Sequence, residues 1–299
     1  MKRQKITVSQ AVIAFEKSNR ADMLEEATIR WYSEVLKRLE GLYGTDISRV
    51  TTDDLREVIN IIRDQCAEHT RLSYVTAFKR FWSWVAAEYN IPDPMVRIRK
   101  GSPRQATPKA VEIDTFLKLF RSIPDTDNGV RDRAMIVMLA DTGLRAMELA
   151  RLTVDDIDFG KRRAIVRRGK RGKKRVVPFT SYTHALIERW LLFRPLHATM
   201  LFCAHDGKAL TYWGMRQIIR RLAVRAGVEK ERHNLHGFRH LAGLAALTEG
   251  ANLIDVKELL GHTNIKTTAD FYLIYSDSTL AERHDQHSPL KAIFKKESI

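Results

Sequence analysis

Hydrophobic residues in the first hundred positions recur at intervals of three and four, the spacing of one face of an α-helix. The pattern predicts a first helix around residues 8–18. Another helix is expected directly after the polar stretch Thr51-Thr-Asp-Asp54, which is typical of a helix N-cap. The apolar positions of the other predicted helices are Tyr32, Val35, Leu36, Leu39 and Leu42, then Leu55, Val58, Ile61 and Ile62, then Val75, Phe78, Phe81, Trp82 and Val85. We therefore expect a bundle of four helices, with the aromatic stripe of the last one in its core.

The pattern breaks between residues 90 and 108, where prolines and a glycine are dense. Such residues stop helices and favour extended chain. We predict a basic linker at about residues 95–108 and a domain boundary near residue 104. The two predicted domains are then residues 1–104 and residues 105–299.

The second domain is also predicted to be largely helical. Its expected helices lie at about residues 134–140, 149–152, 182–192, 212–226, 235–247, 254–260 and 267–275. The period changes at residues 164–166 and at Val176-Val177, which are rich in β-branched residues and flank a basic, glycine-containing turn. This change indicates a β-hairpin. The predicted fold class is therefore mainly α, with a small β-sheet in the second domain.

Charge narrows the choice of partner. The chain of 299 residues carries a net charge of +15 with 44% hydrophobic residues, so it is globular and favours a polyanion, either nucleic acid or an acidic membrane surface. Residues 161–175 hold ten basic residues and no acidic one. No apolar run has the length of a membrane span, and no signal peptide is visible at the N-terminus. We expect a cytoplasmic, nucleoid-associated protein that binds DNA and no membrane.

The two cysteines, Cys66 and Cys203, form no CxxC pair, which argues against a disulfide framework and a zinc ribbon. His236 and His240 have the i, i+4 spacing of zinc ligands in metalloproteases. The intervening residues lack the glutamate that this chemistry requires, and Arg239 would repel a metal. We therefore predict no metal site and no cofactor.

Six polar residues could together break a phosphodiester, which needs a nucleophile, positive charge on the nonbridging oxygens and a proton for the leaving oxygen. Guanidinium groups bind phosphate with two parallel hydrogen bonds, and a tyrosine supplies a nucleophilic oxygen. Taken singly, each residue has an ordinary explanation, such as a surface salt bridge for an arginine. The candidate catalytic residues are Arg145, Lys170, His236, Arg239, His262 and Tyr272.

Their order and neighbours resemble the tyrosine recombinase (phage integrase) family over roughly residues 105–285. The matching strings are Asp141-Thr-Gly-Leu-Arg145-Ala-Met-Glu148-Leu149, Gly169-Lys170 followed by Arg175-Val-Val-Pro178, His236-Gly-Phe-Arg239-His240, and Leu260-Gly-His262 followed by Thr267-Thr268 and Tyr272. The resemblance implies an N-terminal four-helix, SAM-like core-DNA-binding domain and a mainly helical catalytic domain. It also implies that Glu148 and His240 support the catalytic residues.

By this resemblance, Tyr272 is the nucleophile, Arg145 and Arg239 hold the phosphate, and Lys170 donates the proton. His236 either takes a proton from the nucleophile or hydrogen-bonds the phosphate. Lys173 is the alternative to Lys170, and Tyr275 is the alternative to Tyr272. Glu148 also lies one turn after Arg145, so an ion pair within one helix is a second reading of this residue.

The implied function is site-specific recombination of double-stranded DNA through a 3′-phosphotyrosyl intermediate and a Holliday junction. The implied assembly is a homotetramer on specific core sites, alone or with a partner recombinase. A type IB topoisomerase and a catalytically inactive DNA-binding regulator are the alternatives. Near the C-terminus, Leu290, Ile293 and Phe294 have helical spacing and lie among Lys291, Lys295 and Lys296. We predict that this C-terminal stripe connects one protomer to the next.

Overall fold

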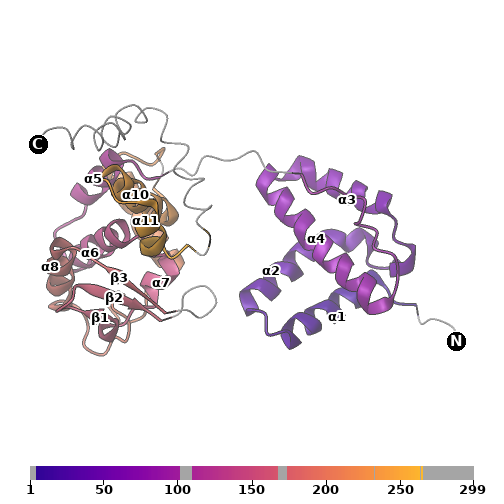
Figure 1. Ribbon diagram of the computed structural model, residues 1–299, viewed down its shortest axis with the longest axis horizontal. Helices are drawn as coiled ribbons and strands as arrows, with labels where there is room; N and C mark the ends of the chain where they lie inside the picture. Colours follow the sequence, from indigo (N-terminus) through magenta and orange to yellow (C-terminus); the bar gives the residue numbers. More distant parts are fainter. Residues whose placement is uncertain (1–4, 102–109, 168–173, 232, 263, 265–299) are drawn as a thin grey trace, which may run out of the picture. The chain divides into compact units, whose positions relative to one another are not determined.

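The computed structural model describes residues 5–101, 110–167, 174–231, 233–262 and 264. The chain divides into two compact units, Met1–Ala106 and Thr107–Ile299, which are coloured along the sequence in Figure 1. Each unit has a hydrophobic core of its own.

Within residues 5–101, the first unit contains four α-helices. They are α1 (Val8–Ala21), α2 (Glu26–Leu36), α3 (Thr52–Gln65) and α4 (Glu68–Tyr89). Two short 3₁₀ helices, η1 (Lys37–Leu42) and η2 (Ile47–Arg49), connect α2 to α3. The aromatic stripe of α4 is core as predicted, because Phe78, Phe81 and Trp82 are fully buried.

Two local predictions for this unit have different outcomes. Thr51 caps α3 as expected: its hydroxyl accepts from the Asp54 N–H at 3.2 Å, and the Asp54 carboxylate accepts from the Thr51 N–H at 2.8 Å. The helix predicted to run through Leu42 ends instead at Leu36, and η1 follows it. A 3₁₀ turn keeps Leu39 buried, so the apolar spacing did not reveal the change.

The predicted linker starts too early at residue 95. Met95 is fully buried in the core of the first unit. The Thr52 hydroxyl donates to the Pro94 carbonyl at 2.9 Å, and Lys79 Nζ donates to the Met95 carbonyl at 3.2 Å. The prolines therefore end α4 without releasing the chain from the first unit. The later part of the predicted linker, residues 102–109, lies outside the described residues.

The second unit contains a three-stranded antiparallel sheet in the order β1-β2-β3. The strands are β1 (Ile157–Asp158), β2 (Arg163–Val166) and β3 (Arg175–Pro178), and Val166 pairs with Arg175 at one end of the predicted hairpin. The helices are α5 (Ile113–Arg121), α6 (Asp127–Thr142), α7 (Ala146–Ala150), α8 (Ser181–Leu191), α9 (Tyr212–Ala226), α10 (Leu235–Thr248) and α11 (Leu253–Leu260), with η3 (Val154–Asp156) before β1. The sequence pattern did not predict α5 or β1, and the helix predicted at 267–275 lies outside the described residues.

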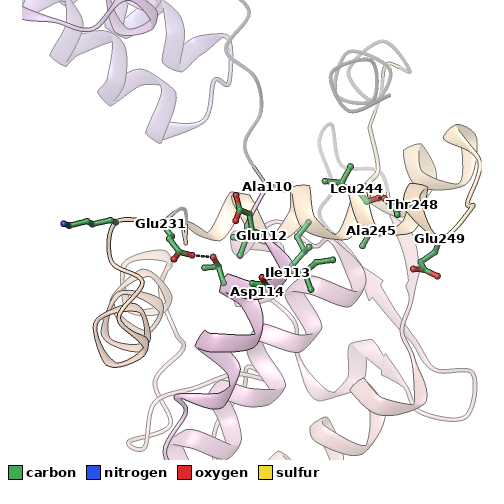
Figure 2. Close-up of a pocket in the computed structure, with 13 residues that line it drawn as sticks. Ala110, Glu112, Ile113, Asp114, Glu231, Leu244, Ala245, Thr248 and Glu249 are labelled. Atoms are coloured by element: carbon green, nitrogen blue, oxygen red, sulfur yellow. Dashed lines mark hydrogen bonds between the residues drawn. The ribbon is translucent and has the colours of Figure 1, made fainter. Parts of the chain in front are cut away.

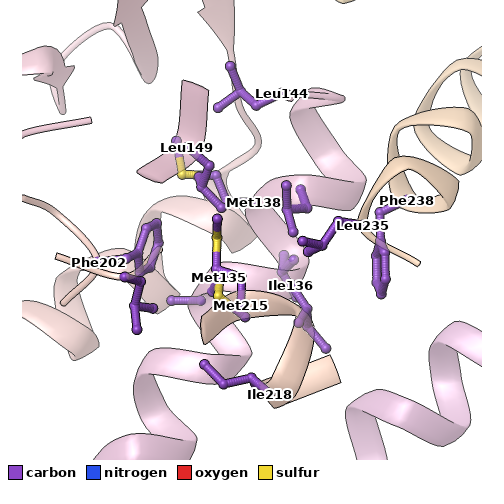
Figure 3. Packing of buried hydrophobic residues seen from close by; sticks show 14 of the residues in the cluster. Met135, Ile136, Met138, Leu144, Leu149, Phe202, Met215, Ile218, Leu235 and Phe238 are labelled. Atoms are coloured by element: carbon purple, nitrogen blue, oxygen red, sulfur yellow. The ribbon is translucent and has the colours of Figure 1, made fainter. Parts of the chain in front are cut away.

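Helix α6 forms the centre of this unit, with α8 and α10 packed against it. Most of its residues are buried, as expected for a helix that is covered on several sides, and they include the ion pair Arg131–Asp132. Figure 3 shows Met135, Ile136 and Met138 of α6 among side chains from α7, α9 and α10. The predicted fold class, mainly α with a small sheet, is confirmed. Among the described residues, no helix is both long and apolar enough to cross a membrane.

Candidate active site

Arg145 lies in the turn between α6 and α7, and a glycine makes this turn possible. Gly143 ends α6 with φ +60°, a left-handed conformation that favours glycine. A Cβ at Gly143 would overlap with the Leu260 side chain at the end of α11. The missing side chain therefore lets the Arg145 turn lie directly against α11.

Glu148 lies one turn after Arg145 and is nearly buried, with 8% of its surface exposed. It accepts hydrogen bonds from the Arg145 backbone N–H at 2.8 Å and from Arg145 Nη1 at 2.9 Å. It also accepts two from Arg175, at 2.7 and 2.8 Å. The predicted ion pair with Arg145 is thus present, and the same carboxylate binds a second arginine from β3.

These contacts keep Glu148 ionised. Burial alone would raise its pKa, but the hydrogen bonds from Arg175 and the Arg145 backbone, together with both guanidinium charges, lower the pKa to about 2. Glu148 is therefore a carboxylate at any pH at which the protein would work.

Arg239 lies on α10 and is 2% exposed. Its Nη1 donates to the Gly143 carbonyl at 2.6 Å, and its Nη2 donates to the Leu260 carbonyl. Burial, and then the charges of Arg145 and Arg175, lower the pKa of Arg239 to about 9, partly offset by Glu148. The guanidinium still carries its charge at neutral pH and retains further N–H groups for a ligand.

His262 follows Gly261, which ends α11 with φ +63°. Its pKa is lowered to about 4, first by burial and then by the charges of Arg239, Arg145, His236 and Arg175. His262 therefore lies near Arg145, two residues of α10 and the start of β3, and is neutral above about pH 5. This electrostatic link places the Arg145 turn, α10 and the start of β3 around one point.

His236 and His240 lie one turn apart on α10, whose first turn is capped by Asn234. Their rings meet edge to face, with centroids 4.4 Å apart. Within the part of the chain that the structure describes, no group of three or more His, Cys, Asp or Glu side chains could hold a metal ion.

The structure thus brings together Arg145, Glu148, Arg239 and His262, with His236 near enough to influence the pKa of His262. The proposed nucleophile and general acid, Tyr272 and Lys170, lie outside the described residues, as do their alternatives, Tyr275 and Lys173. Sequence reasoning gave no role to Arg175, the second partner of Glu148. Its only signal was its place in the Arg175-Val-Val-Pro178 string.

A separate groove runs between the start of α5 and α10, and Figure 2 shows the side chains that line it. Its apolar lining includes Val111, Ile113, Leu241 and Leu244. It also carries the carboxylates of Glu112, Asp114, Glu231 and Glu249, with Lys230 as its one basic lining residue. None of these residues belongs to the arginine and histidine cluster, so the groove is a distinct feature, called here the α5–α10 groove.

Comparison with known proteins identifies the family. The phage integrase family model matches residues 110–278, more than half of the chain. The tyrosine recombinase XerC of Staphylococcus aureus (strain MRSA252) is 28% identical over 260 residues, which cover 82% of this chain and 85% of XerC.

Solved structures of integrases and recombinases share the fold. A lambda integrase dimer bound to a COC′ core site is 16% identical, with a TM-score of 0.76 over 90% of this chain and 77% of that one. The XerH site-specific recombinase bound to a palindromic difH substrate, in a post-cleavage complex, is 22% identical, with a TM-score of 0.74 over 92% of this chain and 83% of that one. The chain therefore belongs to the phage integrase family and is a tyrosine recombinase.

Proposed function

We propose that this protein cleaves and rejoins double-stranded DNA at specific core sites, with Tyr272 as the nucleophile. The observation that carries the proposal is the meeting of two arginines and a neutral histidine, Arg145, Arg239 and His262, at one point of the second unit. Like charges repel, and such perturbed charges cluster at functional sites, where a bound anion offsets the repulsion. A DNA phosphate is such an anion, and the net charge of +15 favours this partner.

Arg145 and Arg239 have different positions in the proposed phosphate site. The Arg145 side chain is 36% exposed and can reach a ligand at the surface. Arg239 is buried and fixed by the Gly143 and Leu260 carbonyls. A phosphate bound between them would take hydrogen bonds on its nonbridging oxygens from both. Because such donors are already oriented, they stabilise the charge that develops in the transition state.

The proposed cleavage step forms one bond and breaks one. The Tyr272 oxygen attacks phosphorus, and the bond to the 5′ oxygen breaks, which leaves a 3′-phosphotyrosyl link and a free 5′ hydroxyl. The 5′ oxygen takes its proton from Lys170, or from Lys173. His262, which is neutral, can both donate and accept a hydrogen bond at the phosphate, and His236 takes the tyrosine proton or binds the phosphate.

The proposed rejoining step reverses this chemistry on a new partner. The phosphotyrosyl bond keeps the free energy of the broken phosphodiester, so a 5′ hydroxyl of another strand can attack it without ATP. Two such exchanges in sequence pass through a Holliday junction. This scheme needs two DNA sites and four active sites, and therefore a tetramer of this chain, alone or with a partner recombinase.

The α5–α10 groove supports the tetramer. Its apolar lining and acidic groups are complementary to the C-terminal stripe, in which three apolar residues lie among lysines. An amphipathic helix commonly binds in such a groove. We infer that the stripe of one protomer, residues 290–296, docks in the groove of the next.

Covalent trapping tests the proposed function. The protein is incubated with fragmented genomic DNA, denatured, and the DNA that stays attached is sequenced. The expected result is a recurring sequence attached through its 3′ end, with no adduct from Tyr272→Phe, which lacks only the phenolic oxygen. DNA binding without any adduct would instead favour the inactive regulator.

Two further arms use a nicked substrate made from the recovered site and a supercoiled plasmid that lacks this site. Cleavage is expected to persist in EDTA, and inhibition that added Mg²⁺ reverses would contradict the proposed chemistry. A plasmid without the site should stay supercoiled. Its relaxation by the wild-type protein would indicate a type IB topoisomerase.

A further inference from the structure

Arg175 is the first residue of β3 and donates two parallel hydrogen bonds to the Glu148 carboxylate. The planar guanidinium matches a carboxylate in this two-bond geometry, which a lysine cannot reproduce. The Arg175 side chain is only 15% exposed, and both of its Nη atoms are bonded to Glu148. Arg175 is therefore poorly placed to bind a phosphate itself.

The Glu148 carboxylate joins Arg175 to Arg145. Oε1 accepts from Arg145 Nη1 at 2.9 Å and from Arg175 Nη1 at 2.7 Å. Oε2 accepts from the Arg145 backbone N–H and from Arg175 Nη2, each at 2.8 Å. Both oxygens are thus divided between the two arginines. Any rotation of Glu148 would change the position of the Arg145 side chain, and Arg175 opposes that rotation.

Arg175 also contacts the turn that precedes His262. A Cβ at Gly261 would lie 2.7 Å from Arg175 Nε and 2.8 Å from its Cδ, closer than real side chains approach. Gly261 has φ +63° besides, so both its backbone and the space around it favour glycine. The Arg175 side chain consequently packs directly against this turn.

The backbone of Arg175 belongs to the β2–β3 ladder. Its pairing with Val166 closes the described ladder of β2 and β3, and Lys170 lies in the connection between these two residues. One side chain therefore touches or adjoins three parts of the proposed site: the Arg145 turn, the His262 turn and the strand that leads from Lys170.

We propose that Arg175 is a positioning residue for DNA cleavage, which fixes Arg145 through Glu148 and holds the start of β3 against the turn of His262. This inference rests on the proposed function. It assigns Arg175 no contact with DNA. Its effect is expected in the rate of the chemical step, with the affinity for DNA unchanged.

The test compares Arg175→Gln and Arg175→Lys with the wild-type protein on the nicked substrate. A displacement of about 1 Å in a catalytic group costs roughly 10²-fold in rate. We expect both variants to cleave about 10²-fold more slowly at saturating protein, with unchanged Kd for the DNA. Arg163→Gln is the matched control, because Arg163 is a strand arginine that binds Asp158 at 2.9 Å, away from the cluster. It should cleave at the wild-type rate.

The pH profile separates positioning from loss of stability. Glu148 is surrounded by the charges of Arg145, Arg175 and Arg239, with His262 and His236 in the same cluster. Removing Arg175 takes away two hydrogen bonds and one of these charges, so the pKa of Glu148 must rise. Cleavage by Arg175→Gln should therefore fall on the acid side at a higher pH than cleavage by the wild-type protein. A variant that was merely less stable, assayed below its Tm, would keep the wild-type profile.

A double mutant completes the test. If Arg175 acts through Glu148, then Glu148→Gln with Arg175→Gln should be no slower than the slower single variant, and the acid-side shift should be absent. Gly261→Ala should resemble Arg175→Gln, because the added methyl group displaces the Arg175 side chain.

The inference is overturned if the wild-type protein cleaves while Arg175→Gln, folded by its melting curve, cleaves equally fast with an unchanged profile. It is also overturned if the double variant Glu148→Gln with Arg175→Gln is slowed by the product of the two single slowdowns in cleavage rate. Failure of the wild-type protein to form any covalent adduct would instead contradict the proposed function.

Discussion

Arg239 Nη1 donates a hydrogen bond to the carbonyl oxygen of Gly143 at 2.6 Å and thereby ties α10 to the turn that carries Arg145. Its Nη2 donates to the Leu260 carbonyl, two residues before His262. Both carbonyls lie at helix ends, where the backbone lacks a partner within the helix. One buried guanidinium thus completes two helix ends and holds together two turns that carry proposed catalytic residues.

Arg239 and Arg145 should therefore differ in their effects on stability. Arg145→Ala and Arg239→Ala should each slow cleavage by about 10²–10³-fold, roughly 2.7–4 kcal/mol, as for loss of one transition-state donor. Arg239→Ala should also unfold more easily than Arg145→Ala, because it leaves two buried carbonyls without a partner, each at a cost of about 1–3 kcal/mol, whereas Glu148 keeps its hydrogen bonds from Arg175 when Arg145 is replaced. Single-turnover cleavage and calorimetry measure the two effects.

Arg194→Ala is the control for this comparison. Arg194 also binds backbone carbonyls, donating to Met200 O at 2.8 and 3.0 Å, but lies outside the cluster. It should lower the Tm and leave the cleavage rate unchanged. Cleavage by Arg145→Ala within about threefold of wild type would show that this arginine does not touch the phosphate.

The helical periodicity predicted most elements because caps and breakers marked their ends. Helix α9 was expected at residues 212–226 and occupies them, since Thr211 caps its start and Gly227 ends it with φ +68°. Helix α5 was missed although Ile113, Phe116, Leu117 and Phe120 have the spacing of one helix face, so its pattern was present in the sequence. The change from α2 to η1 was missed because Leu36, Leu39 and Leu42 are spaced by three residues, and this spacing fits both kinds of helix.

The candidate site was predicted unevenly, for a physical reason. Arg145, Arg239 and His262 came from strings of residues that are contiguous in the sequence. The role of Arg175 depends on its contact with Glu148, 27 positions earlier in the chain, and no local pattern encodes that contact. Only the packing of β3 against α7 reveals it. Lys170 and Tyr272 remain predictions.

The histidine at position 262 should make stability depend on pH. Its pKa is about 4 in the folded protein against a usual value of 6.5, so the unfolded chain binds more protons between these values. The free energy of unfolding is therefore expected to fall as the pH is lowered from about 6.5 to about 4. This fall adds to any change that other titrating side chains cause. Denaturant unfolding at a series of pH values measures it, with His262→Gln as the comparison. Parallel curves for the two proteins would contradict the buried, neutral state of His262.

Lys170→Ala should slow cleavage only where the leaving group needs a proton. If Lys170 donates a proton to the 5′ oxygen, replacing that oxygen by sulfur should restore the rate, because a thiolate leaves without protonation. The substrate is the nicked site with a single 5′-bridging sulfur. Lys173→Ala is the matched variant in the same connection. If the sulfur substrate restores the rate of Lys173→Ala and not that of Lys170→Ala, Lys173 is the proton donor. If Lys170→Ala is equally slow on the oxygen and the sulfur substrates, Lys170 does not donate the proton.

Assembly on DNA should depend on the C-terminal stripe and on the α5–α10 groove together. Deleting residues 288–299 is expected to preserve binding to one DNA site and to weaken the complex of two sites. Glu249→Lys should have the same effect, because it reverses an exposed charge in the groove that would meet the lysines of the stripe. Glu188→Lys is the control, since Glu188 is an exposed acid of α8 that does not line the groove.

Combining the deletion with Glu249→Lys distinguishes docking from unrelated damage. If the stripe binds in the groove, the groove substitution removes an interaction that the deletion has already lost, so the double variant should assemble no worse than the deletion alone. Gel-shift titration with one-site and two-site DNA measures both complexes. A deletion that forms the two-site complex at wild-type protein concentrations, and recombines at the wild-type rate, would show that the stripe does not connect protomers.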